Sequence, residues 1–136
     1  MAQHNHLFNP GAAVTFTAEA AVTAGQLVMI TGDREVSPAT AAGASAWIGS
    51  AATDAAAGED VLVLLGGVQK LLASADITAG ALVACADDGK IATVAAVGGA
   101  WAAADITNTR ALVGIALTSV DVSEVADDRI EVKLFR

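Results

Sequence analysis

The chain of 136 residues carries a formal net charge of −8 at pH 7, and alanine supplies 33 of its 74 apolar residues. This length fits one domain, but the few large apolar side chains predict a thin core, which favours association with further copies or with a larger partner. The seven basic residues are scattered along the sequence. That pattern argues against nucleic acid and against an anionic membrane as partners, because both require clustered Lys and Arg.

Residues 1–18 contain no Asp, Glu, Lys or Arg, although several of them are large and apolar. A free terminal segment is normally polar and solvated. We therefore predict an extended N-terminal arm over residues 1–18 that lies on a partner. The opening MAQHNHLFNP has neither a basic start nor an apolar run, so we expect no signal peptide.

The rest of the chain predicts short aliphatic strands separated by Gly, Asp and Thr turn signals. The expected strands are Gln26–Thr31, Ala46–Ala51, Asp60–Leu65, Val68–Ala73, Ala81–Ala86, Lys90–Val94, Ala111–Leu117 and Arg129–Phe135. The last alternates apolar and charged residues, which is typical of a half-buried strand. Alanine-rich stretches at 39–46, 51–57 and 92–104 lack a helical apolar stripe, so we expect loops or short strands there, with at most one short helix.

One phrase occurs twice. VTAGQLVMITGDREV at Val22–Val36 is repeated as ITAGALVACADDGKI at Ile77–Ile91, 55 positions later. Two further segments also recur. WIGSAAT at 47–53 resembles LVGIALT 65 positions later, and EDVLVLL at 59–65 resembles DRIEVKL 69 positions later. Two copies are too few for a solenoid. The sequence therefore predicts an all-β single domain over residues 19–136, in which two similar units, about 21–73 and 75–136, share one core.

The motifs of common catalytic and metal sites are incomplete. Gly89-Lys90 is followed by Ile91 where a phosphate-binding loop needs Ser or Thr, so Asp87-Asp88-Gly89 is better interpreted as a hairpin turn. His4 and His6 are the only histidines, too few for a structural zinc site. We expect no catalytic residue, no metal and no cofactor.

The remaining candidate residues have plainer interpretations. The Asp87-Asp88 and Asp127-Asp128 pairs lie in predicted turns, and a calcium site at Asp121 or Asp127 stays open. Cys85 is the only cysteine and is interpreted as a small buried side chain. Trp47, inside a strand, is assigned to the core, whereas Trp101 fits the core or an interface equally well.

Five segments in a fixed order carry a resemblance to a known family: NPG-x-x-V-T-F-T-A, A-x-V-T-A-G-Q-L-V, A-W-I-G-x-A, G-E-D-V-L-V-L-x-G-G-V-Q and A-L-V-G-x-A-L-T. Together, from about Asn9 to Arg136, the chain resembles the capsid cement (head decoration) proteins of tailed bacteriophages. The resemblance implies a compact β-clip or tulip-like, partly open barrel and no catalytic motif.

The resemblance further implies a homotrimer on the outer surface of the expanded capsid, bound to the major capsid protein, bridging capsomers and made in the bacterial host cytoplasm. The residues expected at the capsid or trimer interface are Leu7, Phe8, Asn9, Pro10, Val14, Phe16 and Trp101. The alternative is a β-clip module of a phage tail or cell surface that binds a small ligand or carbohydrate. Such a module needs a concave pocket with convergent polar groups, and the shortage of Tyr, His and Asn weighs against it.

Overall fold

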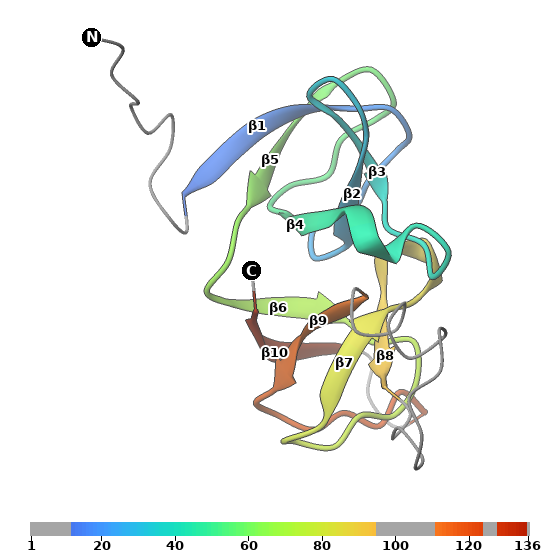
Figure 1. Cartoon of the computed structure of the whole chain (residues 1–136), viewed down its shortest axis with the longest axis vertical. Helices are drawn as coiled ribbons and strands as arrows, with labels where there is room; N and C mark the ends of the chain where they lie inside the picture. The colour runs from blue at the N-terminus through green and yellow to red at the C-terminus, as the bar shows by residue number, and fades with distance from the viewer. Residues whose placement is uncertain (1–11, 95–110, 124–127, 136) are drawn as a thin grey trace, which may run out of the picture.

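The computed structural model describes residues 12–94, 111–123 and 128–135, and most of its regular structure is strand (Figure 1). The first five strands are β1 (Ala13–Ala18), β2 (Leu27–Gly32), β3 (Glu35–Pro38), β4 (Trp47–Ala51) and β5 (Asp60–Leu64). The other five are β6 (Val68–Leu72), β7 (Leu82–Cys85), β8 (Ile91–Thr93), β9 (Leu112–Ala116) and β10 (Arg129–Leu134). Two short 3₁₀ turns, η1 (Ala44–Ala46) and η2 (Asp87–Gly89), complete the described elements. The predicted all-β class is confirmed, and no helix of the described residues is long and apolar enough to cross a membrane.

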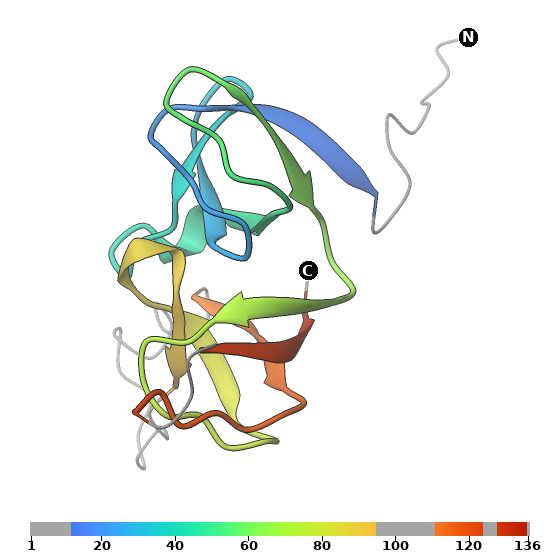
Figure 2. The ribbon, with the colours of Figure 1, turned by 180° about the vertical axis from the view of Figure 1, so that it is seen from behind.

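The strands form two units, which Figures 1 and 2 show one above the other. The first unit is a closed barrel, which reads β3-β2-β4-β5-β1 when it is followed from β3. The second is a five-stranded sheet, which reads β8-β7-β9-β10-β6. Each strand of the first unit therefore corresponds to the strand numbered five higher, as β1 does to β6. The sequence repeat thus reflects two copies of one topology.

The barrel of the first unit closes where β1 runs parallel to β3, with Ala18 opposite Val36. The second unit has a single parallel bridge at the equivalent place, Ala73 opposite Ile91, 55 positions later. The described strand pairs are otherwise antiparallel. The second unit is thus a barrel of the same plan that closes through one residue pair.

The structure differs from the sequence prediction at two boundaries, the end of the arm at residue 18 and the end of the first unit at residue 73. Residues 13–18 belong to β1, which pairs with β5 and β3, so they are part of the barrel and not of an arm. Residues 68–72 form β6, which pairs with β10 and therefore opens the second unit instead of ending the first. The physical reason is closure, because each unit needs a fifth strand before its hairpin to cover the exposed edge of the last strand.

The T-A-G turn has the same structural role in both copies of the repeat. Gly25 and Gly80 both have φ of +88°, a conformation that glycine adopts at little cost. Their N–H groups donate to equivalent carbonyls, those of Ala51 at 2.9 Å and Ala116 at 2.8 Å. The turn therefore ties the start of each hairpin to the strand beside it.

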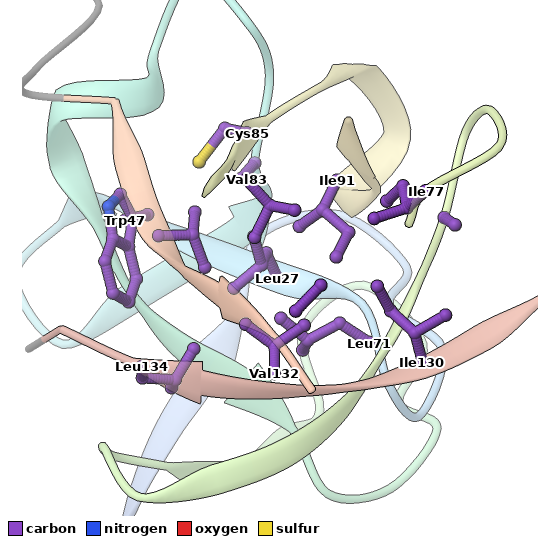
Figure 3. Packing of buried hydrophobic residues seen from close by; sticks show 14 of the residues in the cluster. Leu27, Trp47, Leu71, Ile77, Val83, Cys85, Ile91, Ile130, Val132 and Leu134 are labelled. Carbon is purple, nitrogen blue, oxygen red and sulfur yellow. The ribbon is translucent and has the colours of Figure 1, made fainter. Parts of the chain in front are cut away.

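The two units have equivalent interiors and one shared core. The cluster inside the first barrel consists of Ala18, Val22, Val28, Val36, Ala51, Ala55, Val61 and Val63. Its counterparts in the second unit are Ala73, Ile77, Val83, Ile91, Ala116, Val120, Ile130 and Val132, which all lie in the larger cluster. That larger cluster also contains Leu27, Ala39 and Trp47 from the first unit (Figure 3).

Trp47 joins the units. Its side chain is fully buried, and its indole N–H donates to the carbonyl oxygen of Leu112 at 3.2 Å. Leu112 is the residue that occupies the same place in the second unit. The predicted core role of Trp47 is confirmed, and residues of both units share one hydrophobic cluster.

Candidate docking surface

The structure describes only two of the residues predicted at an interface. On β1, Val14 is 4% exposed, whereas Phe16 is half-buried and packs against the hydrophobic cluster of the first unit. Val14 is therefore a core residue and not a contact residue. Leu7, Phe8, Asn9, Pro10 and Trp101 lie outside the described residues.

The described polar groups form turns and caps. Asp87-Asp88-Gly89 is the turn between β7 and β8, as predicted. The carboxylate of Asp121, considered above for calcium, accepts the hydroxyl of Ser123 at 2.6 Å and its N–H at 3.0 Å, and these bonds hold the pKa of Asp121 below its ordinary value. Cys85 is buried, as predicted. Within the described ranges no three His, Cys, Asp or Glu side chains gather in a way that could hold a metal ion.

The outer side of β5 is unusually apolar for a solvent-facing strand. Val61 and Val63 fill the barrel, whereas Leu62 and Leu64 point outward and are more than a third exposed. Their counterparts on β10 are Glu131 and Lys133. Because the same strand of the same fold carries charges in the second unit, nothing in the fold itself requires leucine at these two positions. Exposed apolar residues without a structural reason indicate an interaction surface.

Two further apolar side chains lie where the chain passes from β5 to β6. Val68 is 57% exposed and Phe135 is 51% exposed. Leu134 donates its N–H to Gly67 at 2.9 Å, which holds the end of β10 beside this linker. In Figure 1 the end of β5, the start of β6 and the C-terminus lie on the same side of the molecule. We call Leu62, Leu64, Val68 and Phe135 together the side surface.

A groove of about 370 Å³ between the units borders the side surface. It is lined by Ala24, Gly25, Ser50, Ala51, Ala52, Leu64, Val68, Gln69, Lys70 and Arg129. At its floor the hydroxyl of Ser50 donates to the side-chain carbonyl of Gln69, whose amide donates to the carbonyls of Leu64 and Gly66. These polar groups are therefore satisfied by one another and hold the two units together.

The groove also has positive charge at its edge. Lys70 on β6 and Arg129 and Lys133 on β10 share the outer face of two paired strands, although they are far apart in the sequence. Glu131 is opposite Lys70 on the same face. In a chain of net charge −8, this is a local basic strip beside an apolar surface, which suits a partner that presents apolar side chains and carboxylates.

Fold and surface together describe a small two-unit β protein that presents an apolar, basic-edged side. Residues 8–124 match the family model described as phage cement protein. The chain belongs to this family, which confirms the resemblance noted in the sequence. The family is one of structural phage proteins, and membership implies association with the capsid of a virion.

A solved structure has the same fold. The chain is similar to the N base of head fiber gp8.5 in bacteriophage phi29, with a TM-score of 0.62 and 17% identity over 90% of this chain and 92% of that one. At this identity the likeness establishes the fold. No curated protein matches the chain.

The side surface was not predicted from the sequence. The expected strand Asp60–Leu65 contains Leu62 and Leu64, but a strand prediction does not fix which side chains point outward. The signal was present, because Val61–Leu65 is apolar without interruption, whereas its repeat Ile130–Leu134 alternates with charges. A strand that is apolar on both sides is covered on both sides.

Proposed function

We propose that this cement protein binds the outer surface of the expanded phage capsid as a homotrimer, contacts the major capsid protein and stabilises the shell by bridging neighbouring capsomers. The observation that carries the proposal is the side surface, with leucines on β5 where the repeated strand β10 has charges. It is supported by membership of the phage cement family.

The N-terminal segment supplies a second contact in this proposal. Residues 1–11 include Leu7, Phe8 and Pro10 and no charge, and the described chain begins at residue 12, next to β1. Fixing eleven backbone residues on the shell costs roughly 11–22 kcal/mol. At about 25 cal/mol per Å², burial of roughly 440–880 Å² of apolar area offsets that cost, which is within the range of ordinary protein interfaces.

In this proposal a trimer bridges neighbouring capsomers because it makes several contacts at once and because its basic strip attracts carboxylates. Three arms and three side surfaces on one trimer bind at high effective concentration once the first is engaged. The basic strip of Lys70, Arg129 and Lys133 favours a site on the shell that presents carboxylates. Binding of this kind weakens as ionic strength rises, because exposed charges are screened over about 8–10 Å at moderate salt concentration.

The side surface can be tested by giving β5 the outward residues of β10. The double variant Leu62→Glu with Leu64→Lys should fold, because β10 carries Glu131 and Lys133 at the same positions. We expect its affinity for expanded shells to fall at least tenfold, which corresponds to about 1.4 kcal/mol. Co-sedimentation with shells that lack the protein measures this.

The matched control is Leu117→Glu, which changes a leucine of similar exposure outside the side surface and should leave shell binding within about twofold. A second variant lacking residues 1–11 tests the arm separately. Unchanged binding of the β5 variant would remove the side surface from the proposal, and unchanged binding of the truncated chain would remove the arm.

The groove between the units supports a second candidate function, that of a ligand-binding module. With Ser50 and Gln69 bound to each other, its charged groups are Lys70 and Arg129, so an anionic saccharide is the ligand class that it fits best. A rise in melting temperature with anionic but not neutral saccharides would favour this candidate.

A further inference from the structure

The internal repeat allows each surface of one unit to be compared with the same surface of the other. In the first unit the outer side of β2 and β4 presents two cross-strand pairs, Leu27 with Ser50 and Met29 with Trp47. Leu27, Ser50 and Trp47 are at most 2% exposed because the second unit covers them. We call these four residues the β2–β4 face.

In the second unit the described residues leave the same face at least partly exposed. β7 and β9 pair Leu82 with Ile115 and Ala84 with Leu112, and the bulge at Val113 repeats the bulge at Ile48. All four outward residues are apolar, and none is buried. Leu82 is 45% exposed, whereas its counterpart Leu27 is 0% exposed. We call Leu82, Ala84, Leu112 and Ile115 the β7–β9 face.

The receiving surface shows the complementary difference. In the second unit, the residues at the end of the barrel that meets the first unit are Leu71, Cys85, Val113 and Leu134, and all are buried in the shared core. Their counterparts in the first unit are Phe16, Ile30, Ile48 and Leu65, and all four are partly or well exposed. We call these four the first-unit rim.

The contact between the units is therefore head to tail. A twofold arrangement would bury the same face on both units. Here one unit contributes its outer face and the other its rim. Among the described residues, one face and one rim of the same kind therefore remain without a partner on each chain. Such an arrangement continues into a ring when it closes and into a filament when it does not.

We propose that the β7–β9 face docks on the first-unit rim of a second copy of this chain. Three copies contain six units. In a closed ring of three copies, each unit would dock its face on the rim of the next unit, so that every face and every rim would be covered. The inference rests on the homotrimer of the proposed function, for which it names the two surfaces, and it does not depend on shell binding.

One corner of the contact differs between the units. In the intramolecular contact Gly89 lies close against the first unit, where its N–H donates to Ala39 at 2.8 Å, and an added Cβ would come within 2.7 Å of the Leu27 oxygen. The counterpart of Gly89 is Arg34, whose guanidinium lies 5.5 Å from the centre of the Phe16 ring, over the rim. A second copy therefore has to sit slightly farther out at this corner, and Arg34→Gly should strengthen association several-fold.

The test uses the full chain and two single variants. Leu82→Glu places a charge on the β7–β9 face, and Ile30→Glu places one on the rim at its most exposed residue. We expect the parent to sediment at three times the 13.4 kDa chain mass and each variant to sediment as a single chain. Leu62→Glu, of similar exposure but on the side surface, is the matched control and should remain trimeric.

Mixing the two variants provides the decisive reading. Each retains one intact surface, so an equimolar mixture should form a dimer of one copy of each and grow no further. A parent that stays monomeric at all concentrations would overturn the inference, as would an unchanged mass of Leu82→Glu, the result expected if residues 95–110 of the same chain cover the face. Failure of the mixture to form dimers would also overturn it.

Shell binding measured on the same samples separates this inference from the proposed function. Loss of the trimer in Leu82→Glu with weak residual binding to expanded shells would support both. A parent that binds shells as a monomer would overturn the ring and leave the cement role intact.

Discussion

Gly49 and Gly114 show how closely the two units follow one design. An added Cβ at Gly49 would overlap the carbonyl oxygen of Leu64 on β5, and one at Gly114 would overlap that of Lys133 on β10. The central glycine of W-I-G and L-V-G therefore lets β4 and β9 pass close to the neighbouring strand. This position could be recognised in the sequence as part of the repeat, but the close approach that requires glycine could not.

Gly114→Ala should therefore destabilise the fold by about 3 kcal/mol through overpacking against rigid backbone. Urea unfolding followed by circular dichroism measures this. Gly58→Ala is the control, because its φ of +86° adds strain of about 1 kcal/mol but its Cβ meets nothing within 4 Å. Equal costs for the two variants would contradict the close approach.

The hydrogen bonds of Asp121 make a small part of the free energy of unfolding depend on pH. The hydroxyl and then the N–H of Ser123 lower the pKa of its carboxyl in the folded chain, so the fold favours the ionised form. Its contribution to the free energy of unfolding is present above the unfolded pKa of about 3.9 and is lost as pH falls through the lower folded value. Because the group is fully exposed, the effect is small.

We therefore expect Asp121→Asn to be slightly less stable than the parent at pH 7 and to match it near pH 2. Urea midpoints across this pH range give the difference. A gap that stays constant or widens on acidification would show that the charge of Asp121 contributes nothing.

At the level of elements, the sequence predicted eight of the ten strands in the described part of the chain within one or two residues at each end, because each is a short aliphatic run between turn residues. β1 was missed because the lack of charges in residues 1–18 suggested an arm, although Val14, Phe16 and Ala18 alternate with threonines as in a strand. β3 was missed because it is short and ends at Pro38, which cannot continue a hydrogen-bonded ladder.

Trp47 tests the contact between elements of different units. Trp47→Ala should cost about 3–5 kcal/mol, since it empties a large site in the shared core. Trp47→Phe should cost about 1 kcal/mol, mainly for the lost hydrogen bond to Leu112. Amide exchange should locate the loss in β9 and β10 as well as in β4. Protection lost in the first unit alone would mean that the units are stabilised independently.

At the scale of the whole molecule, two copies of one unit have diverged in what they show to the outside. Their interiors match position by position, but β5 presents leucines where β10 presents charges. Among the described residues, β7 and β9 also leave partly exposed the face that β2 and β4 bury. The family was recognisable from ordered motifs in the sequence. The surfaces were not, because the side on which a residue lies depends on strand register and on the bulges at Ile48 and Val113.

Co-sedimentation of the purified chain with expanded capsids that lack it, with unexpanded shells as the control, tests the cement role most directly. We expect saturable binding to expanded shells alone, in multiples of three chains per site. Equal binding to both shell forms, or binding to neither, would contradict it.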